Sequence, residues 1–221
     1  MVDFVHERFS FCFRLFGSSL ESIILGPSKT SVRLINQKKE SEYFIAITPP
    51  QPVYEEAMAL KNYFNDNYQS KASLNSPPHI TLHMPFKWKE AKEPLLVEKL
   101  SQFASDQHLL EVVLRNFNCF HPRVIYIDVV ANEKLTALQN ELHRFFKIEL
   151  NVFNANYKEH PFHPHLTLAF RDLKKQNFEK AWEEFREKNF EAKFQVSEIV
   201  LLKHDGKMWQ PHTNFKLTTN E

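Results

Sequence analysis

Residues Pro77–Phe86 read PPHITLHMPF, and the essential pattern of this stretch recurs at residues His163–Phe170, which read HPHLTLAF. The two stretches share His-x-Thr-Leu followed by a short apolar run. A four-residue pattern that recurs in this way indicates two copies of one structural unit. The sequence therefore predicts two similar lobes, each of which contributes one motif strand.

Both stretches have the composition of β-strands, in which successive side chains point to opposite faces. The predicted polar faces carry His79, Thr81 and His83 in the first copy, and His163, His165 and Thr167 in the second. The opposite faces carry Ile80, Leu82 and Met84 in the first copy, and Leu166, Leu168 and Phe170 in the second. Each copy thus offers histidine and threonine side chains to one face of a sheet.

The composition is that of a globular protein with a sizeable core. The chain has 221 residues, of which 43% are hydrophobic and 14% aromatic, enough for one large domain or two small, closely packed lobes. The formal net charge of +1 lacks the strongly basic footprint of a duplex nucleic-acid binder. A nucleic-acid substrate is therefore expected to be small or locally held.

Glycine and cysteine exclude two further classes of protein. With only three glycines, at 17, 26 and 206, neither a dinucleotide-binding G-x-G-x-x-G loop nor a P-loop can exist here. Two cysteines, Cys12 and Cys119, do not make a disulfide framework, so we expect a cytoplasmic protein. Charged residues interrupt the apolar stretches of residues 1–25, which predicts neither export nor insertion into a membrane.

Residues 1–40 are interpreted as a loosely attached N-terminal extension, and residues 41–221 as the folded domain. Hydrophobic periodicity predicts helices at about 52–68, 92–106, 132–147 and 174–188, the third with Asn132 as its N-cap. Strands are predicted at 43–48, 109–119, 124–130, 194–203 and 208–217, besides the two motif strands, with an Asp-Gly turn at 204–207. This order of elements is typical of an α+β fold.

The duplicated motif suits chemistry at a phosphodiester. Histidine titrates near neutrality, so one imidazole can accept a proton from water or a sugar hydroxyl while the other protonates the departing oxygen. A threonine hydroxyl on the same face can donate to a non-bridging phosphate oxygen and stabilise the charge that develops there. We therefore interpret His79, Thr81, His165 and Thr167 as candidate catalytic residues.

These motifs resemble those of the two-histidine phosphoesterase superfamily, which includes RNA 2′,3′-cyclic phosphodiesterases and the 2′-5′ RNA ligases. The likeness covers about residues 41–218 and includes Pro49-Pro50, Pro85-Phe86 and the segment 123–126, RVIY. It implies a bilobal, pseudo-symmetric fold with two antiparallel sheets lining a central cleft and helices outside. It also implies metal-independent hydrolysis, or reversible formation, of 2′,3′-cyclic phosphates or 2′-5′ linkages, without a cofactor.

One departure from the family's pattern concerns the second motif. Relatives near the RNA ligase branch carry His-x-Thr-Leu-x-Arg, whereas this chain has Phe170 at that place and Arg171 one residue later. Alternation predicts that Arg171 faces the cleft and that Phe170 faces away. The resemblance implies a small nucleotide or an RNA end as the substrate, with no membrane and no protein partner.

Further residues are candidates for binding such a substrate. His83 and His163 lie on the predicted cleft faces, and the aromatic ring of Tyr126 could stack on a base. Arg123, Arg171, Lys203 and Lys87 are candidate phosphate-holding cations.

Other interpretations remain open at this point. The histidines could be ordinary surface residues, or the four at 79, 83, 163 and 165 could approach a zinc site. The chain could also be a nucleotide- or RNA-binding module with little catalysis. A phosphodiesterase for a non-RNA cyclic phosphate, such as ADP-ribose 1″,2″-cyclic phosphate, would use the same residues.

Overall fold

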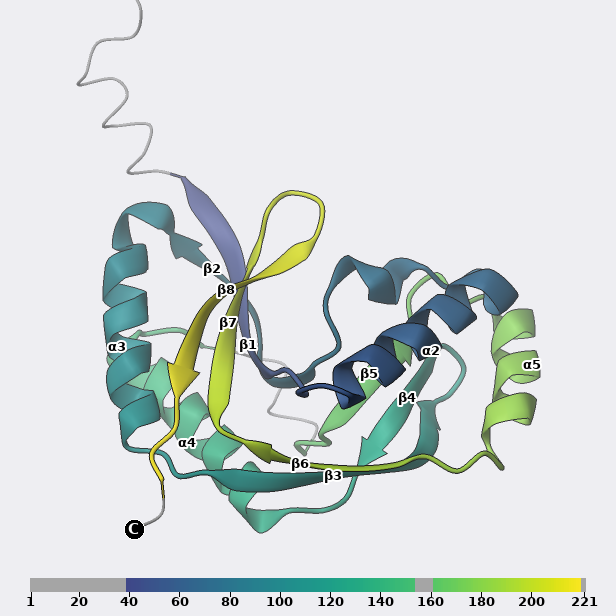
Figure 1. Ribbon diagram of the computed structural model, residues 1–221. Coiled ribbons are helices and arrows are strands. Elements are labelled where there is room, and N and C mark those ends of the chain that lie inside the picture. Colours follow the sequence, from purple (N-terminus) through teal and green to yellow (C-terminus); the bar gives the residue numbers. More distant parts are fainter. Residues whose placement is uncertain (1–38, 154–160, 220–221) are drawn as a thin grey trace, which may run out of the picture.

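The computed structural model describes residues 39–153 and 161–219 (Figure 1). Their strands form one antiparallel sheet in the order β6-β3-β4-β5-β2-β1-β7-β8, which curls around its centre. The predicted extension, residues 1–40, lies almost wholly outside the described part, so the domain boundary stays a prediction. None of the helices in residues 39–153 and 161–219 has the extended apolar stretch that a membrane span requires.

The sheet consists of two four-stranded halves that meet at the motif strands. The first half contains β1 (Glu40–Ile47), β2 (Ile80–Lys89), β7 (Glu198–His204) and β8 (Trp209–Lys216). The second contains β3 (Leu110–Phe120), β4 (Val124–Val129), β5 (His165–Ala169) and β6 (Glu191–Val196). One residue pair, Ile80 with Leu166, joins β2 to β5. The predicted α+β, bilobal architecture is confirmed, but the two antiparallel sheets that were expected are joined at this pair into one eight-stranded sheet.

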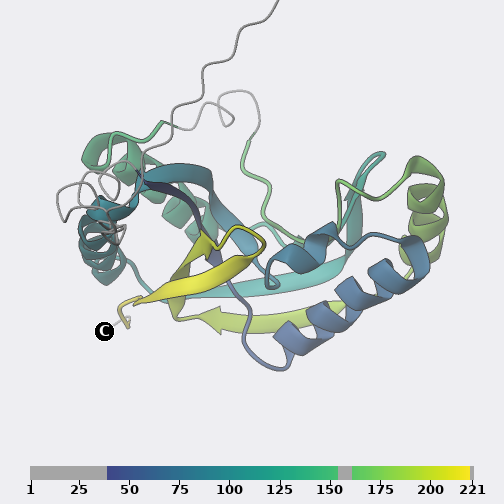
Figure 2. The same ribbon diagram turned by 90° about the horizontal axis from the view of Figure 1, so that it is seen from above.

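The halves repeat the same order of elements. The first runs β1, α2 (Val53–Tyr68), β2 and α3 (Glu93–Ser105), with short 3-10 turns at Ala72–Asn75 and Glu90–Lys92. The second runs β4, α4 (Glu133–Glu149), β5 and α5 (Lys175–Phe185). Figure 2 shows α3 and α4 at one end of the sheet and α2 and α5 at the other. Helix α2 contacts β5 of the opposite half, and α4 contacts β2, so the helices tie the halves together.

The apolar residues of the helices and sheet form one large core. Phe64 of α2, Phe146 of α4 and Phe178 of α5 are fully buried in it. A second, smaller cluster of Phe44, Ala46, Val200 and Leu202 covers the other face of β1 and β7. Both faces of β1 are therefore buried, which explains its nearly continuous apolar sequence.

Most predicted elements are found within a few residues of their expected bounds. The side chain of Asn132 accepts a hydrogen bond from the backbone N–H of Leu135 at 3.1 Å, as expected for an N-cap. The Asp-Gly turn joins β7 to β8, and Gly206 has a φ of +99° that favours glycine.

The predicted strand at 194–203 is wrong as a single element. It is two strands, because the chain leaves β6, which pairs with β3, and crosses at Ser197 to β7, which pairs with β1 and β8. The Ser197 carbonyl accepts from the backbone N–H of Leu217 at 2.8 Å at this crossing. The polar pair Ser197-Glu198 is the one local mark of the crossing, and no glycine or proline there signals the change of partner.

Candidate active site

The four candidate catalytic side chains come together at the meeting of the halves. His79, Thr81, His165 and Thr167 all line one cavity of about 740 Å³. His79 immediately precedes β2, Thr81 lies in it, and the second pair lies in β5. All four are partly exposed, so a ligand in the cavity can reach them. The cavity is large enough for a small nucleotide.

The same irregularity follows both motifs. Thr81 pairs with Ala46 and His83 with Ile45, so Leu82 is an extra residue of β2. In β5, Thr167 pairs with Tyr126 and Ala169 with Ile125, which makes Leu168 the extra residue. A β-bulge of this kind reverses the alternation of the residues that follow it.

The bulges correct three predicted orientations. Met84 and Phe170 line the cavity, although alternation predicted that they face away from it. His83 was predicted to face the cleft but is only 1% exposed, and its ring stacks on Phe146 of α4 at 3.9 Å. His83 therefore belongs to the core, and the predicted role in substrate binding does not fit its position.

Each motif histidine is held in the same way. The Nδ1 of His79 lies 2.7 Å from the carbonyl oxygen of Pro77, and that of His165 lies 2.7 Å from the carbonyl oxygen of His163. A carbonyl only accepts, so each Nδ1 carries a proton and donates it. Nε2 is then the nitrogen left free to exchange protons in both rings.

Aromatic rings support the two imidazoles from neighbouring strands. The ring of Phe44 in β1 packs on His79 with centroids 4.9 Å apart. Tyr126 in β4 packs on His165 at the same centroid distance, and Phe120 packs on it at 5.0 Å. In both motifs these aromatic contacts restrict the side-chain rotamers of the catalytic candidates His79 and His165.

Burial lowers the pKa of both histidines. The pKa of His79 falls to about 4, chiefly because desolvation disfavours the imidazolium, with further repulsion from Lys61 and His165. Desolvation is also the main cause of the lowered pKa of His165. The two imidazoles repel each other when both are charged, so the site favours at most one proton on the pair.

His163 and Tyr126 lie beside the second motif. His163 lines the cavity, and its Nε2 is 3.2 Å from the Tyr126 hydroxyl and 3.3 Å from Asp128 Oδ1. Tyr126 is 1% exposed and does not line the cavity. Its position suits support of the two histidines better than stacking on a base.

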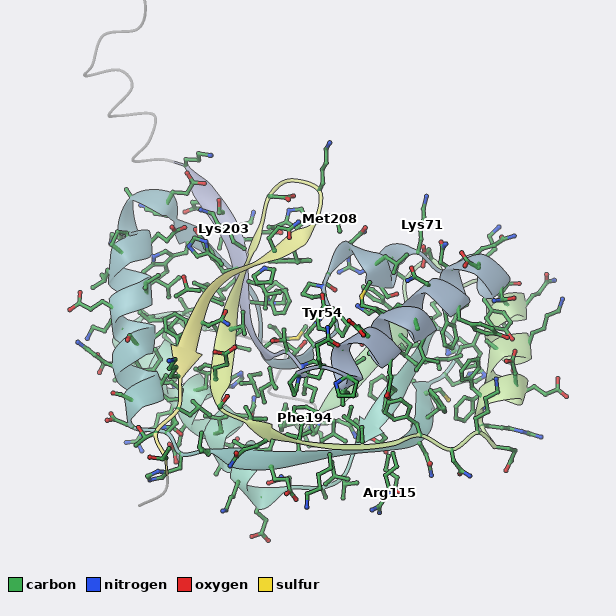
Figure 3. The ribbon with its side chains drawn as sticks, viewed as in Figure 1. Tyr54, Lys71, Arg115, Phe194, Lys203 and Met208 are labelled. Carbon is green, nitrogen blue, oxygen red and sulfur yellow. The ribbon has the colours of Figure 1, made fainter. Side chains whose placement is uncertain are left out.

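The predicted cations are not at this cavity. Lys203 lies on β7 in the first half (Figure 3), where its Nζ binds Glu93 Oε2 at 2.6 Å. Arg123 and Lys87 are exposed, and neither lines the cavity. Arg171 adopts a positive φ of 57° and places its guanidinium 5.0 Å from the Phe170 ring centroid. It is Phe170, rather than Arg171, that faces the cavity.

Lys61 of α2 lines the cavity and was missed. It stands in the apolar stripe of its helix, between the fully buried Ala57 and Phe64. A lysine at a position where the helical period requires an apolar residue was the signal that could have revealed it.

The zinc alternative lacks its geometry. Since His83 lies in the core, the four histidines at 79, 83, 163 and 165 do not face one point. Within residues 39–153 and 161–219, no three His, Cys, Asp or Glu side chains are grouped so that they could hold a metal ion.

Known proteins with similar sequences match this chain over most of their length. A protein of Geobacillus sp. (strain WCH70), named "Putative phosphoesterase GWCH70_0799", is 29% identical over 163 residues, which is 73% of this chain and 87% of that protein. A relative from Oceanobacillus iheyensis, also named a putative phosphoesterase, is 28% identical over 179 residues, covering 80% and 98% of the two chains.

Solved structures share the fold. Escherichia coli LigT complexed with 3′-AMP superposes with a TM-score of 0.61 at 20% identity, over 81% of this chain and 99% of LigT. TT0787 of Thermus thermophilus gives a TM-score of 0.58 at 18% identity, over 81% of this chain and 100% of that one. The family model of the 2′-5′ RNA ligase superfamily matches residues 49–208, which include both motifs. The chain therefore belongs to the 2′-5′ RNA ligase superfamily of two-histidine phosphoesterases.

Proposed function

We propose that this phosphoesterase hydrolyses, or reversibly forms, 2′,3′-cyclic phosphates or 2′-5′ linkages at RNA ends or in small nucleotides, by metal-independent acid–base catalysis. One observation carries the proposal. Two imidazoles with identically anchored Nδ1 atoms line one cavity together with two threonines. The 3′-AMP in the LigT complex is an adenine nucleotide with a phosphate on the ribose, which supports a substrate of this class.

The chemistry uses the free Nε2 atoms of His79 and His165. One Nε2 accepts a proton from water as the water oxygen bonds to phosphorus. The other, protonated, donates its proton to the ribose oxygen whose bond to phosphorus breaks, and the product is a phosphomonoester. In the reverse direction a ribose hydroxyl attacks, and the two histidines exchange their roles.

The threonine hydroxyls have a matching place in this scheme. Thr81 and Thr167 lie two residues after their histidines and line the same cavity. Each hydroxyl can donate to a non-bridging oxygen, where charge grows in the transition state.

Replacing either threonine by valine, which keeps its shape, is expected to lower kcat by about 10²–10³-fold, the usual cost of one such donor. The measurement is steady-state hydrolysis of the best cyclic substrate by Thr81→Val and Thr167→Val. Thr213→Val is a matched control, because Thr213 is a strand threonine of β8 away from the cavity. If kcat of both motif variants is within threefold of wild type, the threonine hydroxyls do not stabilise the transition state.

The pH dependence follows from the lowered histidine pKa values. A general acid must carry its proton. Both candidate acids, His79 and His165, have a pKa below the usual histidine value of about 6.5, so each is deprotonated at a lower pH than a free histidine. We therefore expect kcat/KM to fall about tenfold per pH unit above roughly pH 6.5, and to fall on the acid side only near pH 4. A profile that is level or rising between about pH 7 and 9 would contradict the assignment of a histidine as the acid.

A substrate panel tests the function itself. The panel consists of 2′,3′-cyclic nucleotides, short RNAs with a cyclic end, 2′-5′-linked dinucleotides and ADP-ribose 1″,2″-cyclic phosphate, with products separated by chromatography. Turnover of any of the first three supports the proposal. Turnover of the ADP-ribose compound alone would mean a non-RNA substrate, and binding without turnover of any member would mean a binding module.

A further inference from the structure

Lys61 is a buried lysine that the proposed chemistry does not use. It is 1% exposed, and its neighbours on the same stripe of α2, Ala57 and Phe64, are fully buried. A buried charge without a partner costs considerable free energy, so such a lysine calls for an explanation.

Two carbonyls hold the lysine's nitrogen. Lys61 Nζ donates to the carbonyl oxygens of Ser73 and Ser76, both at 2.8 Å. An ammonium has three N–H donors, and within the described part of the chain Nζ makes no ion pair and no third hydrogen bond. One donor is therefore available to a ligand.

The turn that receives these bonds leads directly to the first motif. Ser76 precedes Pro77, whose carbonyl accepts the Nδ1 proton of His79. Ser73 Oγ in the same turn is buried without a hydrogen-bond partner among the described residues. Lys61, Ser73 and Ser76 all line the cavity, so an unsatisfied hydroxyl and an unused N–H donor lie close to His79.

Lys61 is the single lysine or arginine among the described residues that line the cavity. Among its described lining residues there is no arginine, no second lysine, no aspartate and no glutamate; the other titratable side chains are His79, His163 and His165. A phosphodiester that enters carries a negative charge, and a cation in a low-dielectric site attracts it strongly. Arg123, Arg171 and Lys203, the cations predicted from the sequence, do not line it.

We propose that Lys61 is an anion-binding residue of this site, whose amine takes up a proton when a phosphate or sulfate group enters the cavity beside His79. This inference rests on the proposed function, since it names the group that would hold the substrate's phosphate. The proton comes from solvent, and no covalent bond changes.

The electrostatics agree with proton uptake on binding. Desolvation lowers the pKa of Lys61 to about 7, so the amine is largely neutral in the empty cavity at mildly alkaline pH. An anion beside it favours the ammonium and raises this pKa again. The other titratable side chains that line this cavity with Lys61 are His79 before β2, and His163 and His165 of the second motif. The pKa values of His79 and His165 lie lower than that of Lys61, so these rings titrate in a more acidic range.

Calorimetry with inorganic sulfate tests the inference without using activity. Sulfate keeps its charge in this range, so at about pH 8 the heat of binding in two buffers of different ionisation enthalpy reports protons taken up by the protein. We expect uptake of a large fraction of one proton by wild type and by His79→Ala. Lys61→Met should abolish this uptake and weaken sulfate binding at least tenfold at about pH 6.5.

Lys71→Met is the matched control, because Lys71 is an exposed lysine close to the same turn and does not line the cavity (Figure 3). It should bind sulfate as wild type does. If Lys61→Met binds sulfate with unchanged affinity and unchanged proton uptake, the inference is overturned. If Lys61→Met fails to fold, the measurement on wild type is sufficient, because sulfate binding without proton uptake at about pH 8 contradicts the inference.

The substrate panel separates this result from the proposed function. If wild type turns over a substrate but calorimetry shows no proton uptake with sulfate, Lys61 is not the anion-binding residue and the proposed function is retained. If wild type binds sulfate with proton uptake but hydrolyses no member of the panel, the anion site is supported and the proposed hydrolysis is contradicted.

Discussion

Replacing His79 or His165 by alanine is expected to lower kcat by about 10²–10⁴-fold, the contribution typical of one positioned general acid or base. The reason is geometric. Each imidazole presents its free Nε2 to the same cavity, because its Nδ1 is engaged by the carbonyl two residues earlier. Alanine removes the proton acceptor or donor and leaves the bulge and the strand unchanged.

The measurement is kcat of both single variants with the cyclic substrate that wild type turns over fastest. His121→Ala is the control, since His121 is an exposed histidine at the turn between β3 and β4 and does not line the cavity. Far-ultraviolet circular dichroism and thermal unfolding should show that all variants stay folded. A motif variant that retains more than a tenth of the wild-type kcat would contradict its assigned role.

Replacing Phe146 by alanine is expected to lower the free energy of unfolding by about 3–5 kcal/mol. Phe146 is fully buried, and its ring contacts His83 at 3.9 Å and Phe86 at 5.0 Å between centroids. Through these contacts Phe146 packs α4, from the second half, against β2 of the first. Alanine would leave a cavity beneath the first motif that the rigid sheet cannot fill.

Urea unfolding of Phe146→Ala against wild type measures this loss. Ile148→Ala on the same helix is the control, because Ile148 is 61% exposed and its replacement should change stability by no more than about 0.5 kcal/mol. A loss below about 1 kcal/mol for Phe146→Ala would show that the halves do not depend on this contact.

The sequence predicts the two motif strands and their shared site because His-x-Thr-Leu recurs, and alternation holds from His79 to Thr81 and from His165 to Thr167. Alternation fails after each threonine, where Leu82 and Leu168 are extra residues. A bulge depends on how the partner strand pairs, and β1 and β4 carry no local signal of it. Met84, Phe170 and His83 were misplaced for this reason.

Two other features lay beyond local patterns. Between Phe194 and Lys203 no glycine or proline marks a strand end, only the polar pair Ser197-Glu198, and the change of pairing partner there depends on where β3 and β1 lie. The buried position of Lys61 could have been noticed from the helical period. Its proposed role in anion binding could not be predicted, because the carbonyls of Ser73 and Ser76 and the cavity come together only in three dimensions.

We propose that His79 and His165 carry out the acid–base chemistry without a metal ion, and hydrolysis of a 2′,3′-cyclic nucleotide in excess EDTA is the decisive test. Wild type and the double variant His79→Ala/His165→Ala are compared in the same assay, with zinc or magnesium added back in a parallel series. We predict that wild type turns over at an unchanged rate in EDTA and that the double variant is inactive. Loss of wild-type activity in EDTA with recovery on adding metal, or turnover by the double variant, would contradict metal-independent catalysis by these two histidines.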